Sequence, residues 1–236
     1  MSAEQRLTQV RARIEVACLD AGRDPEEITL VAVSKGISAE RIAQILGLGV
    51  TDIGENKAQE AAAKAAEIQV LAPRVNPRWH FVGQLQRNKA RMVAQFASMV
   101  HSVDRLAVVT ALDRAAGQRP RPLDVLVQLD LDPDPDPARG GAAPENLQGL
   151  ADAVLAAEHL TLRGIMTVAP PGTDPRRSFD RLVGYSESLQ AVQPTAAVIS
   201  AGMSGDLEAA ISAGATHVRV GTALFGARKL ASDYRL

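Results

Sequence analysis

Apolar positions follow two alternating patterns along the chain. Between Leu7 and Ala21 they recur at helical spacing, with a capping serine at Ser2, which predicts an amphipathic helix at the N-terminus. Residues 29–35 then form an apolar, β-branched run that is bounded by Gly36. Such a run is typical of a buried parallel strand.

Runs of this kind recur at regular intervals, and helical stripes separate them. The predicted strands cover residues 29–35, 50–53, 79–82, 99–102, 123–129, 162–167, 196–200 and 217–220. The predicted helices after the first cover residues 38 to 47 or 49, 57–70, 87–96, a segment capped by Asp104, a segment from Pro144, a segment around 179–189, 206–213 and 223–230. Eight strands alternating with helices predict a (β/α)8 TIM barrel, an α/β fold, with one extra N-terminal helix. An open doubly wound sheet is the alternative.

Composition agrees with one domain over residues 1–236, since there is no internal repeat and no Pro/Gly-rich linker. Aromatic residues are only 3% of the chain, so the core must consist mainly of aliphatic side chains. The net charge of -1 gives no reason to expect general attraction to nucleic acid or membranes. The single cysteine, Cys18, lies on the apolar stripe of the first helix and cannot form an internal disulfide. The polar amino terminus lacks the apolar core of a signal peptide, so we expect a cytoplasmic protein.

Lys35 ends the first predicted strand, at the edge of the sheet where α/β proteins place their chemistry. An apolar floor beneath a lysine favours the neutral amine, which can attack a carbonyl. Lys35 is therefore a candidate Schiff-base residue. On this run alone, an ordinary solvated lysine at a strand end is the favoured interpretation.

Other polar residues fall at the ends of neighbouring strands. Asn56 follows the second strand and His80 lies in the third, while Ser102 and Asp104 end the fourth. We expect these residues on the same rim as Lys35. His80 is also compatible with a core histidine, and Asn56 with a simple helix cap.

The turns after the seventh and eighth strands give the strongest signal. In barrels these two loops commonly bind phosphate through backbone amides, and Gly221 allows close approach while Ser204 and Thr222 supply hydroxyls. The glycines alone are also consistent with tight turns. Arg219 alternates with two valines and should point into the barrel, where a buried arginine needs a partner.

Metal and triad chemistry find no support in the sequence. No Cys/His cluster has zinc spacing, and no Ser/His/Asp set is indicated. The acidic, proline-rich stretch at 132–137 fits no calcium-loop pattern and predicts an extended, solvated loop. We therefore expect no metal site.

A lysine able to form an imine, an anion cradle on the same rim and an inward arginine match the needs of pyridoxal 5'-phosphate, PLP. The aldehyde meets the lysine, the phosphate meets the cradle, and the ring nitrogen needs a partner. These features would equally suit a Schiff-base aldolase that acts on a phosphorylated sugar.

Several motifs resemble one family in order and spacing. They are VAVSK at 31–35, GEN at 54–56 with 59–60, WHFVG at 79–83 with LQ at 85–86 and NK at 88–89, and GMS at 202–204 with residues 206–228. Together they resemble the pyridoxal phosphate homeostasis protein family, also called proline synthase co-transcribed homologues. Members of this family are single-domain barrels similar to the N-terminal domain of alanine racemase.

The resemblance implies that Lys35 carries PLP as an internal aldimine. It further implies that Arg219 faces the pyridine nitrogen and that Ser204, Gly221 and Thr222 hold the phosphate. Asn56, His80 and Met203 would line the ring pocket. An arginine at the ring nitrogen keeps that nitrogen unprotonated and weakens the ring as an electron sink.

The function that the resemblance implies is a PLP carrier that buffers or delivers the cofactor in vitamin B6 homeostasis, without catalysis. The implied partners are PLP and PLP-dependent apo-enzymes, and we expect a monomer or a weak dimer that binds neither nucleic acid nor membranes. The alternative is a racemase-like enzyme. Racemisation needs a second acid/base group over the ring, and the only tyrosines are Tyr185, in a predicted helix, and Tyr234, near the end of the chain.

Overall fold

The computed structural model describes residues 1–134 and 140–226. Part of the acidic proline-rich stretch, part of the last predicted helix, the end of the 206–228 motif and Tyr234 lie outside the described residues.

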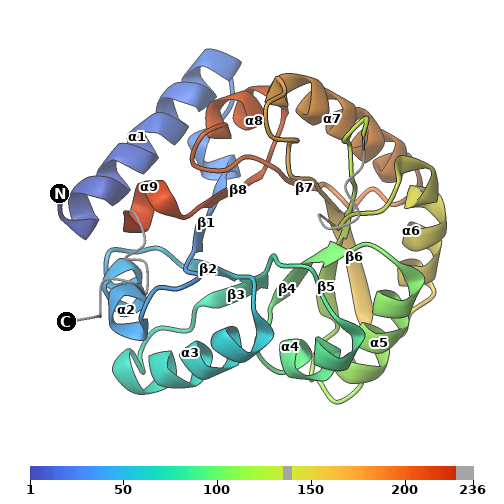
Figure 1. Ribbon diagram of the computed structural model, residues 1–236, viewed down its shortest axis with the longest axis horizontal. Coiled ribbons are helices and arrows are strands. Elements are labelled where there is room, and N and C mark those ends of the chain that lie inside the picture. The colour runs from blue at the N-terminus through green and yellow to red at the C-terminus, as the bar shows by residue number, and fades with distance from the viewer. Residues whose placement is uncertain (135–139, 227–236) are drawn as a thin grey trace.

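Eight parallel strands close into a barrel in the order of the sequence (Figure 1). The strands are β1 (Thr29–Val33), β2 (Asp52–Glu55), β3 (Arg78–Phe81), β4 (Met99–Val103), β5 (Leu123–Gln128), β6 (Leu160–Met166), β7 (Val198–Ser200) and β8 (His217–Val220). The predicted (β/α)8 barrel is confirmed, and the open-sheet alternative is wrong because β8 pairs with β1.

Helices form a ring around this barrel. They are α1 (Ala3–Ala21), α2 (Ala39–Gly47), α3 (Ala58–Leu71), α4 (Ala90–Phe96), α5 (Leu106–Ala116), α6 (Leu147–Leu155), α7 (Pro175–Val192), α8 (Leu207–Ala213) and α9 (Thr222–Phe225), with short 3-10 turns η1 (Pro25–Glu27), η2 (Arg87–Lys89) and η3 (Pro144–Asn146). The extra helix α1 begins at a Ser2–Gln5 capping box and lies against α8 and α9 (Figure 1). No described helix is long and apolar enough to cross a membrane.

Two kinds of packing fill the molecule. Aliphatic side chains between the strands and the helices form the main core, as the low aromatic content requires. Inside the barrel, Met99, Leu126 and Met166 form a small apolar cluster on the side of β4 to β6. Buried polar side chains of β2, β3, β4, β7 and β8 fill the space beside this cluster, and these include His80 and Arg219.

Two predicted boundaries were wrong for identifiable reasons. The second strand begins at Asp52 rather than at residue 50, since the Val50 N–H still donates to Ile45 O at the end of α2. It runs through Gly54, which looks like a breaker, because a Cβ there would lie only 3.0 Å from the Val31 side chain. Asp104 does not cap α5, because its carboxylate accepts from the Arg105 guanidinium instead.

Candidate functional site

Lys35 lies on the turn that follows β1 at the carboxyl end of the barrel. The Ser34 N–H continues the sheet by donating to Gly54 O at 2.9 Å, and the Ile37 N–H closes the turn on Ser34 O at 2.9 Å. Gly36 takes φ of 72°, which its missing side chain permits. Alternation along an extended strand puts Lys35 on the same face as Val33, the face that looks into the barrel. The lysine is half-buried there.

A buried ion cluster anchors this turn from the outer side. Lys64 Nζ, on α3, donates to Glu55 Oε1 at 2.6 Å, to Glu60 Oε1 at 2.6 Å and to Ser34 O at 2.7 Å. The Ser34 hydroxyl donates to Glu55 Oε1, and the Gly36 N–H donates to Glu60 Oε1, each at 2.6 Å. Both residues that flank Lys35 are therefore fixed by hydrogen bonds to side chains of β2 and α3.

Burial raises the pKa of Glu55, although the hydrogen bonds from Lys64 and Ser34 oppose that shift. Burial acts the same way on Glu60, but there the hydrogen bonds from Lys64 and from the Gly36 N–H outweigh it and lower the pKa. Sequence reasoning missed Lys64, which looks like a solvated helix residue. Its spacing of four residues from Glu60 was the available signal.

The loops after β7 and β8 meet at the same rim. Ser204 accepts a hydrogen bond at 3.3 Å from the Ala223 N–H, which joins the two loops. A Cβ on Gly202, whose φ is 88°, would lie 2.6 Å from the Ala210 side chain, so only glycine fits that turn. Met203, between them, is 39% exposed. Thr222 begins α9 and is exposed at the rim.

The pairing of β1 with β8 brings Lys35 and the glycine loop together. Ala32 lies opposite Val220, so the next residue, Gly221, lies beside the end of β1. A Cβ on Gly221 would come within 3.2 Å of Val33 O. The turn that carries the amine and the loop that offers backbone amides are thus direct neighbours at the mouth of the barrel.

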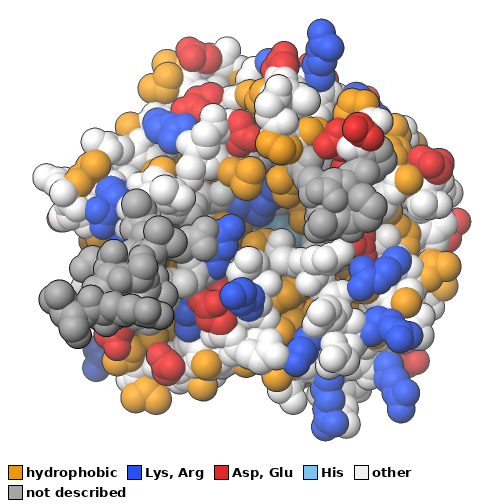
Figure 2. Space-filling view, in the orientation of Figure 1, with side chains coloured by type: hydrophobic (Ala, Val, Ile, Leu, Met, Phe, Trp, Pro, Cys, Tyr) orange, Lys and Arg blue, Asp and Glu red, His pale blue; other side chains and the backbone are white. Residues whose placement is uncertain are grey.

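Arg219 lies below this mouth, inside the barrel, as its alternation with two valines predicts. Its side chain is buried; Nη1 donates to Ser200 Oγ at 2.6 Å and Nη2 donates to Thr167 O at 2.8 Å. Burial lowers the pKa of Arg219 to about 10, and the charge of Asp206 opposes that shift. The guanidinium therefore stays charged at neutral pH. Figure 2 shows basic side chains and a histidine at the hollow centre of this face.

A chain of buried hydrogen bonds leads from Arg219 across the barrel. Ser200 Oγ lies 2.9 Å from His101 Nδ1, His101 Nε2 lies 2.8 Å from His80 Nδ1, and His80 Nε2 lies 2.8 Å from Asp52 Oδ1. The chain of hydrogen bonds thus connects a buried cation with a buried carboxylate through Ser200, His101 and His80.

One arrangement of protons satisfies every hydrogen bond between Arg219 and Asp52. Arginine only donates, so Ser200 Oγ accepts from Arg219 and its own proton is available to His101 Nδ1. Burial lowers the pKa of His101 far below its usual value, so this ring carries one proton. With that proton on Nε2, His101 donates to His80, and His80 donates to Asp52. Every hydrogen bond then points from the arginine toward the carboxylate.

Asp52 ends the chain near the opposite, amino-terminal face of the barrel. Arg78, which is largely exposed, holds both of its carboxylate oxygens at 2.7 Å. Burial alone would raise the pKa of Asp52, but the hydrogen bonds from His80 and Arg78 hold it well below its usual range. The carboxylate is therefore ionised at neutral pH.

The predicted ring-pocket residues differ in how they are held. Both ring nitrogens of His80 are engaged by protein groups, so the core-histidine interpretation describes its contacts, and it offers a ligand only its ring. Asn56 does not cap α3, whose cap residue is Lys57. Its Oδ1 is buried without a hydrogen-bond partner among the described residues. A Cβ on Gly83 would lie 2.2 Å from Asn56 O, so Gly83 lets the backbone pack tightly here.

His101, Ser200 and Asp52 are the interior residues whose contacts the sequence did not reveal, because pairing across a barrel depends on closure. His101 lies two residues after Met99 on β4, and this spacing predicts that both side chains point to the same, inner face of the strand. Among the described residues, no group of three or more His, Cys, Asp or Glu side chains could hold a metal ion.

Comparison with known proteins is consistent along the whole chain. Residues 7–229 match the family described as the alanine racemase N-terminal domain. The pyridoxal phosphate homeostasis protein of Pseudomonas aeruginosa is 41% identical over 95% of this chain and 95% of its own length. That of Escherichia coli K12 is 40% identical over 94% of this chain and 95% of its own length. Among solved structures, PipY of Synechococcus elongatus with PLP bound is 33% identical, with a TM-score of 0.82 over 95% of this chain and 100% of that one.

The buried histidines make stability depend on pH. Burial lowers the pKa of His217, near His80 inside the barrel, from 6.5 to about 4. As pH falls from 7 to 4, the unfolded chain binds a proton at His217, whereas His217 in the folded chain stays mostly neutral. The free energy of unfolding therefore falls, by up to about 3 kcal/mol from this residue. We expect His217→Gln to lose less stability over this range than the wild type, as measured by urea unfolding at pH 7 and pH 4.5.

His159→Gln is the matched control, since His159 lies on the surface before β6. It should show the same pH dependence as the wild type. Equal pH slopes for His217→Gln, His159→Gln and the wild type would contradict the burial of an uncharged His217.

Proposed function

The chain belongs to the alanine racemase N-terminal domain family and, within it, to the pyridoxal phosphate homeostasis proteins, and we propose that it binds PLP at the mouth of its barrel and carries it without catalysis. The observation that supports this most is the meeting of the Lys35 turn with the Gly221 loop directly above the buried Arg219. An amine, an anion cradle and a cation thus occupy one small region. The proposal takes residues 1–236 as one cofactor-binding domain.

The residues at this mouth fit PLP on grounds independent of the relatives. Asn56 Oδ1 is buried and has no partner among the described residues, so it can accept a hydrogen bond from a ligand. Gly221 leaves open the space that a side chain would take beside Val33. The loops joined through Ser204 carry further donors, including the Thr222 hydroxyl.

In this proposal each residue has one task. Lys35 would hold the cofactor covalently through its Nζ, which can condense with an aldehyde carbon with loss of water. Ser204, Gly221 and Thr222 bind the phosphate, and Asn56, His80 and Met203 line the ring. The ion cluster around Lys64 holds the Lys35 turn in place, so the amine is presented without rearrangement of the backbone.

Arg219 determines what the bound cofactor can do. PLP supplies an electron-withdrawing ring, and this effect is strongest when the ring nitrogen is protonated. A charged guanidinium only donates, so the nitrogen beside Arg219 accepts a hydrogen bond and stays unprotonated. The hydrogen-bond chain to Asp52 holds the guanidinium charged and in one orientation. The site therefore favours holding the cofactor over carbanion chemistry.

A second acid/base group for racemisation is missing from the mouth as far as the structure describes it. Tyr185 lies on α7 in the outer ring of helices. We propose accordingly that the protein is not a racemase and that it works in the cytoplasm as a monomer that delivers PLP to apo-enzymes.

Lys35 is tested by chemical trapping. The protein incubated with PLP should be yellow, and after borohydride reduction and peptide mapping the label should be on Lys35. Lys35→Ala should lose the absorbance and the label, because no other amine lies beside the Gly221 loop among the described residues. Lys57→Ala is the control, since Lys57 is exposed at the start of α3, and should be labelled at Lys35 like the wild type.

A label on another lysine, or none, would contradict the assignment of Lys35. A protein that purifies colourless, ignores PLP and is trapped at Lys35 by a phosphorylated sugar would support the aldolase alternative instead.

Racemase activity is tested with pure protein saturated with PLP. We expect no conversion between L- and D-alanine above that of the Lys35→Ala variant, because the described residues supply no second proton-transfer group at the mouth. Sustained turnover, followed by chiral chromatography and absent in Lys35→Ala, would contradict the non-catalytic proposal.

A further inference from the structure

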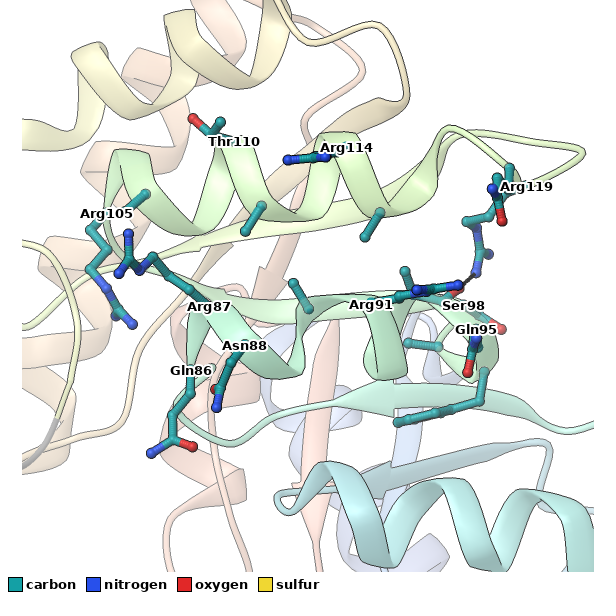
Figure 3. A pocket seen from close by; sticks show the side chains of 18 of the residues that line it. Gln86, Arg87, Asn88, Arg91, Gln95, Ser98, Arg105, Thr110, Arg114 and Arg119 are labelled. Carbon is teal, nitrogen blue, oxygen red and sulfur yellow. Dashed lines mark hydrogen bonds between the residues drawn. The ribbon is translucent and has the colours of Figure 1, made fainter.

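A long basic groove runs between α4 and α5 on the outside of the barrel. Its volume is about 1740 Å³, and its lining runs from Gln86 beside η2 to Pro120 before β5. Figure 3 shows Arg87 and Arg105 toward one end, Arg91 and Arg119 toward the other, and Arg114 on α5 between them. Five arginines therefore line one groove of a chain whose net charge is only -1.

Four of these five arginines form no ion pair among the described residues, whereas Arg105 pairs with Asp104. None of the described residues that line the groove is acidic. Arg87, Arg91 and Arg114 are exposed and make no ion pair or side-chain hydrogen bond within the part of the chain that the structure describes. Such a concentration of unpaired guanidinium groups creates a positive potential along the groove.

Arg119 gives a second, independent observation. Its Nη1 donates to Ala94 O on α4, while its Nε is buried and has no partner among the described residues. A buried donor without an acceptor costs free energy, so an incoming acceptor at this end of the groove would relieve that cost.

The floor between the two rows of arginines is apolar and built of small side chains. Ala90 and Ala94 of α4 face Ala107, Ala111 and Ala115 of α5, at intervals of four residues along each helix. Small residues at this spacing let another helix approach closely. The floor along α5 is about 16 Å long, from the eleven residues of that helix, which equals about three helical turns.

We infer that this groove is a docking surface for an acidic amphipathic helix of a partner protein. The partner's apolar stripe would lie on the alanine floor, and its carboxylates would meet the arginines on both sides, including Arg119, whose Nε has no partner among the described residues. Recognition of this kind combines a hydrophobic groove with charge complementarity. Because η2 and Arg105 follow β3 and β4, one end of the groove lies at the rim of the barrel.

Other occupants fit less well. A second copy of this chain would place arginines against arginines if the two grooves met. Single-stranded nucleic acid needs aromatic platforms, and Phe96, the only aromatic side chain among the described residues that line the groove, packs edge-on against Trp79. A small phosphate ion would contact only part of this row of cations.

The test uses a fluorescent synthetic helix of about 14 residues, with an alanine and leucine stripe and glutamates on both sides, titrated against the full chain. We expect Arg91→Glu combined with Arg114→Glu to weaken binding at least about tenfold, and added salt to weaken binding to the wild type. The control is Arg74→Glu combined with Arg177→Glu, which makes the same change in net charge at two exposed arginines outside the groove. This control should bind as the wild type does.

Three further probes are titrated against the full chain in the same way. They are a peptide of the same composition with its amphipathic order scrambled, inorganic polyphosphate and a single-stranded RNA oligonucleotide. The inference is overturned if the scrambled peptide binds as tightly as the acidic helix, or if either polyanion binds more tightly. It is also overturned if both double variants lose the same affinity, or if the acidic helix binds no more tightly than about 1 mM. Unchanged circular-dichroism melting of both double variants shows that any loss is a loss of contact.

Discussion

The structure depends on keeping one positive charge inside the barrel. Arg219 is buried, and a buried guanidinium is tolerated only when acceptors surround it. Thr167 O and Ser200 Oγ are two such acceptors. Hydrogen bonds through His101 and His80 then connect Ser200 to an ionised Asp52. This requirement divides the interior. Strands β2, β3, β4, β7 and β8 carry the polar side chains that link Arg219 to Asp52, while Met99, Leu126 and Met166 of β4 to β6 form a separate apolar cluster.

The buried charge of Arg219 also limits which ligands the rim above it can bind. The charge of Arg219 cannot move, so any ligand at the mouth must present an acceptor toward it. The neighbouring turns are fixed as well, since Lys64 and Glu60 bind the residues on both sides of Lys35, and Gly221 packs against the end of β1. In the proposed function, a ligand with an aldehyde, a phosphate and a basic ring nitrogen would meet all three conditions. That agreement connects the interior chain to the proposed role as a PLP carrier.

Much of this could be predicted from the sequence, and the limits are physical. Periodicity predicted the barrel and the rim, and the alternation of valines around Arg219 predicted its inward direction. Periodicity did not predict which interior groups touch, because contacts across a barrel, such as His101 with Ser200, depend on closure and tilt. Lys64 looked solvated for a related reason, since its carboxylate partner comes from a neighbouring strand. The groove between α4 and α5 depends on the distance between helices, which no local pattern specifies.

The central claim, that a charged Arg219 faces the ring nitrogen of the bound cofactor, is tested most directly by nitrogen NMR. The protein is loaded with PLP labelled with 15N in the pyridine ring, and the chemical shift is followed from pH 6 to pH 9. The account predicts the shift of an unprotonated pyridine nitrogen throughout this range. A pyridinium shift, or a titration between the two within the range, would contradict it.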